Sequence, residues 1–276
     1  MLLSCFVALV DGGGGAIGLL LSALIAASLG ATLFFGSRVS PSADSALAFA
    51  SVAWSWLAVS LVGAIPFLLT GVITWGRFDD AIFESISGFT CTGSTIFSDF
   101  SVIPQGVLFY RSLTQWLGGM GIIVLAVTVL PSLGVGGLQL MAAESPGHKS
   151  DKLRARAIDT AKSLWAVYFG VTIVISLLLW ATPSANLYDA VAHGLSTAAI
   201  GGFSTYNESI GSFDSYLVEL IIVLGMFTGA MNYNLQYKFL SSKGNFRVFL
   251  ESSEWKLYVK ITGLFIAVVF SLNWLI

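Results

Sequence analysis

The chain of 276 residues is too apolar to be a soluble globular protein. Hydrophobic residues make up 56% of it, charged residues make up 10%, and the mean hydropathy is +0.85. Because a water-exposed surface needs far more charge, we expect an all-α polytopic membrane protein that lies in the lipid bilayer. The net charge of -2 indicates no particular partner, and no nucleic-acid partner is expected.

The N-terminal residues and the cysteines indicate no signal peptide, cofactor site or disulfide. Residues 1–10 lack the charged start and the cleavage site of a signal peptide, so we expect the tail of a helix. The glycines at 12–15 are followed by Ala16-Ile17, where a phosphate-binding loop would need Lys-Ser/Thr. Cys5 and Cys91 lie far apart in the predicted topology and have no metal-ligand spacing.

Long apolar segments predict a series of membrane-spanning helices, because about 20 residues cross a bilayer. An interfacial helix is expected over Leu133–Ala143, within the longest polar connection. We place the spans at residues 16–35, 45–70, 104–130, 157–181 and 214–238, with a final span that begins near residue 255.

A segment too short to span the bilayer lies between two of these apolar runs. Residues 78–95 read FDDAIFESISGFTCTGST, which predicts a short amphipathic helix over Phe78–Gly88 and an extended polar segment after it. Non-helical backbone at membrane depth is tolerated only where protein or a water-filled path surrounds it. Its physical use is to direct carbonyl oxygens toward a dehydrated cation, so we predict a re-entrant pore loop.

The same segment returns 109 residues later without a gap, which places a second pore loop at residues 186–204. A shared offset indicates a repeated unit, here helix, re-entrant loop and helix. The corresponding pairs are Trp56 and Trp165, Asp80 and Asp189, Ser87 and Ser196, Gly93 and Gly202, and Thr95 and Ser204.

This repeat divides the chain into five parts. We expect an incomplete N-terminal hairpin at 1–40, a first repeat at 41–142, a cytoplasmic loop at 143–156, a second repeat at 157–240, and a linker with the first helix of an incomplete third repeat at 241–276.

Basic residues orient the predicted topology. Eleven of the 13 fall on one side, which is therefore cytoplasmic, and both pore loops enter from the outside. Acidic residues on the outer side concentrate cations at an entrance, although the same residues also cap pore helices and solvate loops. The cytoplasmic set is Arg38, Lys149, Lys152, Arg154, Arg156, Lys162, Lys238, Lys243, Arg247, Lys256 and Lys260; Arg77 and Arg111 lie outside, with Asp79, Asp80, Glu84, Asp99, Asp189, Glu208 and Asp214.

The extended parts of the two loops are the candidate ion filter. Backbone carbonyls replace the water ligands of a bare cation without adding net charge, so the ion can also leave. Directing the carbonyls in this way requires an unusual backbone conformation, and glycine reaches positive φ without steric cost. We expect this conformation at Gly93 and Gly202. The filter candidates are Thr90, Cys91, Thr92, Gly93 and Ser94 in the first loop and Ala199, Ile200, Gly201, Gly202 and Phe203 in the second, with the potassium ion at Thr92, Gly93, Gly201 and Gly202.

Three stretches carry a resemblance to a known family, and the resemblance extends from about residue 16 to the last residue. They read FESISGFTCTGSTIF, RSLTQWLGGMGIIVLAVTVLPSLGVGGLQL and STAAIGGFSTYNESIG, and they resemble the Trk/Ktr/HKT superfamily of cation transporters, most closely its bacterial Trk-type membrane subunit. The polar loop AESPGHKSDKLRARAIDTAKSLW is also similar.

The resemblance implies a multi-pass protein of the bacterial cytoplasmic (inner) membrane that takes up potassium. It implies four linked repeats around one pore, a homodimer, and a soluble nucleotide-binding regulatory subunit on the cytoplasmic face. Potassium is then the substrate, and the membrane chain has no cofactor. Gly93 and Gly202 match the family's filter glycines, and glycine rather than serine at the first position is associated with potassium over sodium.

Two departures from the family pattern affect these expectations. Cys91 stands where threonine is expected. Because backbone carbonyls coordinate the ion, a thiol is tolerated there, but it introduces a site sensitive to oxidation or silver. Two filter loops are present where the family has four, so the chain resembles a fragment or a truncated product and is expected not to transport ions by itself. The alternatives are a sodium-permeable or potassium/sodium transporter of the same superfamily and a non-conducting truncated subunit.

A further alternative is an intramembrane hydrolase that uses His193 with Ser196 or Ser204. A nucleophile elbow requires glycine two residues after the serine, and Tyr206 stands there after Ser204. His193 also corresponds to Glu84 of the first repeat, which favours a packing or hydrogen-bonding role in the pore helix. We therefore do not expect an enzyme.

Overall fold

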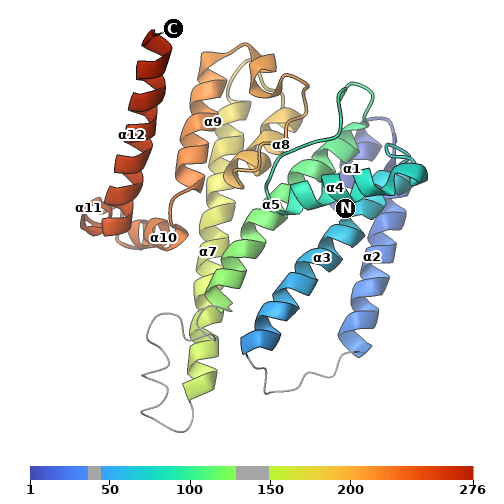
Figure 1. The fold of residues 1–276 in the computed structure, drawn as a ribbon, viewed down its shortest axis with the longest axis horizontal. Helices are drawn as coiled ribbons and strands as arrows, with labels where there is room; N and C mark the ends of the chain where they lie inside the picture. Colours follow the sequence, from blue (N-terminus) through green and yellow to red (C-terminus); the bar gives the residue numbers. More distant parts are fainter. Residues whose placement is uncertain (37–44, 129–148, 276) are drawn as a thin grey trace.

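The computed structural model describes residues 1–36, 45–128 and 149–275, which contain helices and connecting loops but no strand (Figure 1). The predicted all-α architecture is confirmed for these residues. The longer helices are α1 (Leu2–Val10), α2 (Ala16–Gly36), α3 (Ser45–Leu69), α4 (Phe78–Phe89), α5 (Gln105–Thr128), α7 (Lys149–Trp180), α8 (Leu187–Ala198), α9 (Tyr216–Gly229), α10 (Tyr233–Ser241) and α12 (Ser253–Leu275). Shorter turns of helix are η1 (Trp75–Arg77), η3 (Ser209–Phe213) and α11 (Arg247–Glu251).

The repeat predicted from the sequence is present in the backbone. Helix α4 begins at Phe78 and ends at Phe89, and helix α8 begins and ends 109 residues later, at Leu187 and Ala198. Each short helix follows one long helix, α3 or α7, and is followed by a loop and a second helix, α5 or α9. Helix α5 also packs against α7 and α8, so the two units share an interface.

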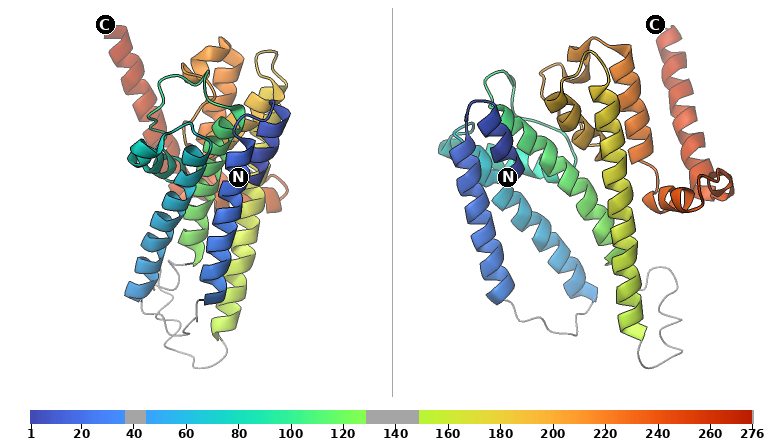
Figure 2. Two further views of the ribbon diagram at one scale, coloured as in Figure 1. Left: turned by 90° about the vertical axis from the view of Figure 1, so that its right-hand side faces the viewer. Right: turned by 180° about the vertical axis from the view of Figure 1, so that it is seen from behind.

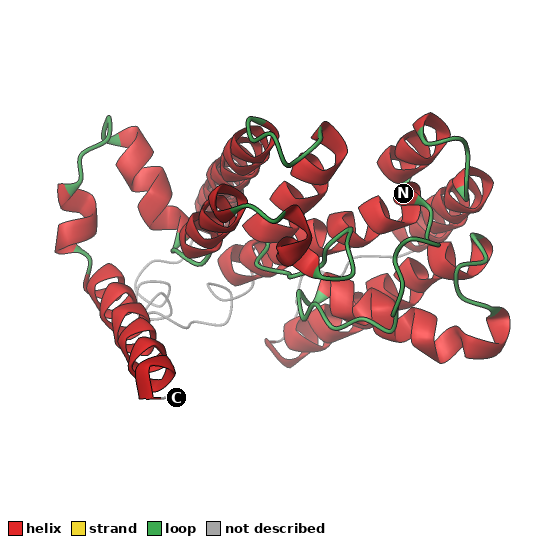
Figure 3. Ribbon diagram, turned by 90° about the horizontal axis from the view of Figure 1, so that it is seen from above, coloured by secondary structure: helices red, strands yellow, loops and turns green. Residues whose placement is uncertain are grey.

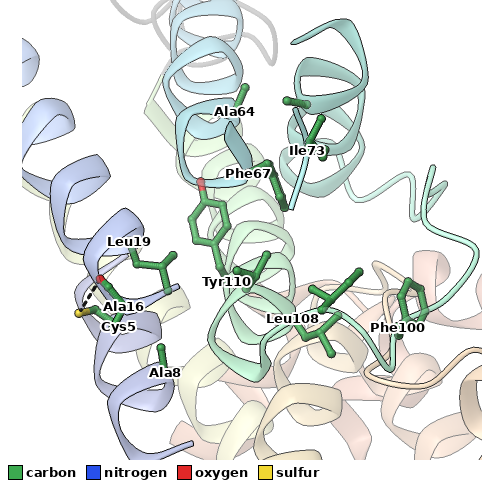
Figure 4. Close-up of a cluster of buried hydrophobic side chains, with 13 residues drawn as sticks. Cys5, Ala8, Ala16, Leu19, Ala64, Phe67, Ile73, Phe100, Leu108 and Tyr110 are labelled. Carbon is green, nitrogen blue, oxygen red and sulfur yellow. Dashed lines mark hydrogen bonds between the residues drawn. The ribbon is translucent and has the colours of Figure 1, made fainter. Parts of the chain in front are cut away.

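The N-terminal hairpin packs on the first unit. Helix α1 contacts both α2 and α5, and a small apolar cluster forms where they meet α3 (Figure 4). Cys5 donates its thiol hydrogen to the Ala16 carbonyl in this cluster, at 3.4 Å, and it is not in a disulfide. Tyr110 of α5 donates a hydrogen bond to the Gly63 carbonyl of α3 at 2.9 Å, which ties together two helices of the first unit.

Several helices have the length and apolar character of membrane spans. In the described part of the chain they are Ala16–Gly36, Ala50–Leu69, Asp159–Trp180 and Ser253–Leu272, and a bent pair, α9 with α10, would make a fifth. Helix α12 buries none of its apolar stretch and stands at the edge of the molecule, joined through α10 and α11 (Figures 2 and 3).

The structure corrects two of the predicted boundaries. The span expected at 214–238 is broken after Gly229, and α9 and α10 meet at 95°. Asn232 caps α10 by accepting a hydrogen bond from Asn234 N, and Gln236 Nε2 donates to the carbonyls of Thr228 and Met231, at 2.9 and 3.4 Å, which ties α10 to the end of α9. Residues 149–156, expected in a loop, form the start of α7, because they are rich in the helix formers Lys, Arg, Leu and Ala. The interfacial helix expected at Leu133–Ala143 lies outside the described residues.

Candidate ion pathway at the paired loops

The two pore helices aim their C-terminal ends at the loops. Asn186 caps the start of α8 by accepting a hydrogen bond from Asp189 N at 2.8 Å. The start of α4 carries Asp79 and Asp80 in its first turn, and Asp80 pairs with Arg77. Acidic groups stabilise the positive end of a helix dipole, and the negative ends then face the loops that follow.

The two loops follow the same backbone course. Cys91 and Ile200 both adopt positive φ, at 55° and 56°, and Gly93 and Gly202 both do so two residues later, at 76° and 85°. The hydrogen bonds repeat as well: Thr92 N donates to the Ser87 carbonyl, and the corresponding Gly201 N donates to the Ser196 carbonyl. Positive φ was predicted from the sequence for the two glycines. It was not predicted for Cys91 and Ile200, whose side chains disfavour positive φ.

The two glycines have different surroundings. A Cβ atom added at Gly93 would lie 2.2 Å from the carbonyl oxygen of Gly201, so the first and second loops touch here. A Cβ atom added at Gly202 would meet nothing within 4 Å. Gly93 is therefore needed both for its φ and for space, whereas Gly202 is needed for its φ alone.

Open space lies on both sides of the glycine positions. A cavity of about 430 Å³ is bordered by the ends of α4 and α8, and a smaller one of about 160 Å³ by the segments that follow the glycines. The first cavity is lined by Trp56, Phe89, Thr90, Cys91, Gly118, Gly119, Tyr168, Ala198, Ala199, Ile200, Gly229 and Tyr233, and the second by Gly93, Thr95, Phe97, Ser98, Phe100, Arg111, Gly202, Phe203, Ser204, Tyr206, Asn207 and Ser209. The residues just before the glycines thus line the larger cavity, and the glycines with the residues after them line the smaller one.

A buried ion pair stands behind the first loop. Arg111 Nε lies 2.7 Å from Glu84 Oε1, and both side chains are shielded from solvent. Glu84 also accepts hydrogen bonds from the Thr95 hydroxyl at 3.0 Å and from Ile96 N at 3.1 Å. The guanidinium of Arg111 lies over the ring of Phe203, 4.1 Å from its centroid. Burying a charge pair costs desolvation energy, and further hydrogen bonds such as these are needed to offset that cost.

A neutral pair takes the same place behind the second loop. His193 and Ser204 correspond to Glu84 and Thr95, and His193 Nε2 lies 2.9 Å from Ser204 Oγ. The other ring nitrogen, Nδ1, lies 2.9 Å from the carbonyl oxygen of Asp189. Because a carbonyl oxygen only accepts, Nδ1 donates, and in the neutral ring Nε2 accepts from the Ser204 hydroxyl. The histidine thus connects the pore helix to the end of the loop, as Glu84 does in the first unit.

The acids predicted at the outer entrance divide into two groups. Glu84 and Asp189 are buried; Asp189 accepts hydrogen bonds from the Thr205 and Tyr206 hydroxyls at 2.7 and 2.6 Å, so its charge is not free to attract cations. Asp99 is exposed, and the Ser101 hydroxyl and amide hold its pKa below the usual range, so it stays charged. Of the other predicted acids, Asp79, Glu208 and Asp214 are exposed, and Asp80 is half-buried and paired with Arg77.

Comparison with known proteins decides the family. The model of the cation transport protein family TrkH matches residues 20–271. The chain belongs to the TrkH family. It is 42% identical to the Trk system potassium uptake protein TrkH of Escherichia coli K12 over 214 residues, which cover 77% of the chain and 44% of that protein. The identity to TrkH of Salmonella typhimurium is 38%, over 95% of the chain and 54% of that protein.

The fold matches a solved member of the same family. The crystal structure of the potassium transporter TrkH from Vibrio parahaemolyticus aligns with a TM-score of 0.81 at 33% identity, and the match covers 95% of this chain and 53% of that one. The chain therefore spans about half the length of the TrkH relatives that it matches.

Two side chains of this TrkH-family site were not found from the sequence. Arg111 was placed on the outer surface by topology alone, and Gln115 was not singled out, yet both are fully buried beside the loops. The available signal was a charge and an amide four residues apart in an otherwise apolar helix, since polar side chains in a membrane helix usually face protein or water.

Proposed function

We propose that the chain supplies two walls of a potassium-selective filter in a Trk-type uptake transporter of the bacterial cytoplasmic membrane. The single observation that carries the proposal is the repeated backbone of the two loops, with positive φ at 91 and 93 and again at 200 and 202. Two sequences that share only their final glycine, CTG and IGG, take one unusual conformation, which indicates that the backbone rather than the side chains has the function.

In this proposal the carbonyl oxygens of the loops replace the hydration shell of potassium. The residues that contact the ion are Thr92 and Gly93 in the first wall and Gly201 and Gly202 in the second, within the wider filter segments 90–94 and 199–203. The Gly201 carbonyl accepts a hydrogen bond from Gln115 Nε2 at 2.7 Å, which leaves its second lone pair for an ion. The negative ends of α4 and α8 add a favourable potential for a cation beside them.

The partners follow from the family and from the charges. We propose that the transporter is a homodimer and binds a soluble nucleotide-binding regulatory subunit at its cytoplasmic face. The exposed basic residues Lys238, Lys243 and Arg247 on and between α10 and α11 support that placement, together with the basic start of α7. Potassium is the substrate, and the membrane chain itself needs no cofactor.

A sodium-permeable or mixed potassium/sodium transporter is the second candidate, because the same loops serve both ions and only the filter's dimensions differ. Glycine at 93, the first filter position, supports potassium, as the family resemblance implies. A hydrolase is disfavoured because the His193–Ser204 pair takes the structural place of Glu84 and Thr95, which in the first unit belong to the buried ion pair with Arg111.

The test is uptake of potassium by the complete gene product in a transport-deficient bacterial strain, normalised to membrane protein and repeated with sodium as competitor. Gly93→Ser and Gly202→Ser should each lower potassium-over-sodium selectivity, because each alters one wall and leaves the others in place. If both variants lose only abundance and the surviving protein keeps its selectivity, the loops are not the filter.

A further inference from the structure

Two polar side chains on one face of α5 reach the second loop from the first unit. Arg111 and Gln115 lie one helical turn apart and have no exposed surface. A buried arginine and a buried amide in an apolar helix are costly unless every polar atom has a partner, so what they bond to indicates their purpose.

The side chain of Gln115 bonds entirely to the second unit. Its Nε2 donates to the Gly201 carbonyl at 2.7 Å, and its Oε1 accepts from Phe203 N at 3.1 Å and from the Ser196 hydroxyl at 2.7 Å. Arg111 continues the pattern one turn earlier, since its Nη1 donates to the Ser204 carbonyl at 3.3 Å. Backbone atoms on both sides of Gly202 are therefore fixed by a helix of the other unit.

The first loop has a hydrogen bond from its own pore helix that the second loop lacks. Ser87 of α4 donates its hydroxyl hydrogen to the Ser94 carbonyl at 2.6 Å. The corresponding serine of the second unit, Ser196, donates instead to Gln115, so the second loop lacks this internal bond. The contrast shows that α5 replaces a support that the second unit does not make for itself.

The second unit has no such pair on its own second helix. Helices α5 and α9 begin 111 residues apart, at Gln105 and Tyr216, so the positions of α9 that correspond to Arg111 and Gln115 are Ile222 and Met226, which are both apolar. The support of one loop by the neighbouring unit is thus a property of α5 and not of the repeat.

We propose that Arg111 and Gln115 are positioning residues that set the carbonyl directions of the second loop, so that helix α5 of the first unit determines the ion selectivity of the second wall. The inference rests on the proposed function, in which the loops are the filter. It identifies Gln115 as the more specific of the two, because Arg111 also pairs with Glu84 and holds the first loop through Thr95.

The central experiment replaces Gln115 in the complete gene product and measures potassium uptake, with and without sodium, per amount of protein in the membrane. Gln115→Leu keeps a similar volume and removes all three bonds, and it should lower potassium-over-sodium selectivity by roughly tenfold, since buried partners are left unpaired. Ser196→Ala removes one bond and keeps the loop's other contacts, so it provides a milder variant where Gln115→Leu fails to reach the membrane.

The matched control is Tyr110→Phe, which removes a buried hydrogen bond of the same helix, to the Gly63 carbonyl of α3, and no bond to either loop. It should lower abundance without changing selectivity. For Arg111, the double variant Glu84→Gln with Arg111→Gln removes both charges and leaves neither unpaired, and it should also lower selectivity.

These variants distinguish the positioning role of Arg111 and Gln115 from the filter role of the loops. If Gly93→Ser and Gly202→Ser change selectivity while Gln115→Leu, Ser196→Ala and the double variant behave like Tyr110→Phe, the positioning role is wrong and the filter stands. If the glycine variants also leave selectivity unchanged, the filter itself is wrong.

Discussion

Alanine at the two loop glycines should have unequal effects on stability, although their φ values are similar. Alanine in the left-handed region costs about 1–2 kcal/mol, and both Gly93→Ala and Gly202→Ala incur this term. At Gly202 nothing lies within 4 Å of the new methyl group, so this is the whole effect.

At Gly93 a second term is added. The new methyl carbon would lie 2.2 Å from the Gly201 carbonyl oxygen, which is a backbone atom already held by Gln115. Because this oxygen cannot move without disturbing the second loop, overpacking adds a further ~1–3 kcal/mol. Gly93→Ala should therefore destabilise the chain by about 2–5 kcal/mol, and Gly202→Ala by about 1–2 kcal/mol.

Thermal unfolding of the purified protein in detergent measures this order, with both variants prepared in the same detergent and salt. Alanine at Gly12 is a suitable control, because it has positive φ and an empty neighbourhood outside the pore loops. It should resemble Gly202→Ala. Equal destabilisation by Gly93→Ala and Gly202→Ala, or a larger effect at Gly202, would refute the contact between the loops.

Three further predictions address topology, thiol chemistry and the outer segment. Ser150→Cys should not react with an impermeant thiol reagent added outside intact cells, and labelling from outside would overturn the assigned orientation. Silver or a small thiol reagent should inhibit uptake through Cys91, which borders the larger cavity, and not through the buried Cys5; inhibition that persists in Cys91→Thr would contradict this. Asp189→Asn should lower the apparent melting temperature, because the amide nitrogen cannot accept and one of the hydroxyls of Thr205 and Tyr206 is left without an acceptor, at about 1–3 kcal/mol; an unchanged melting temperature would argue against that network.

The sequence by itself determined the class, the repeat and the place of the loops. Composition and apolar runs are properties of short segments, so they predict helices in a membrane without knowledge of contacts. The 109-residue offset located α8 from α4, and both helices keep it to the residue. Gly93 and Gly202 were predictable because positive φ has a strong residue preference.

Only the tertiary structure decided what supports the loops. Gln115 and Ser196 are 81 residues apart and Arg111 and Ser204 are 93 apart, so no local pattern connects them. The break after Gly229 was likewise missed, because Gln236 ties α10 to the end of α9 and an apolar run gives no sign of it. The positive φ of Cys91 and Ile200 contradicts their own preferences. It persists because hydrogen bonds and packing across two units outweigh a local cost of about 1–2 kcal/mol.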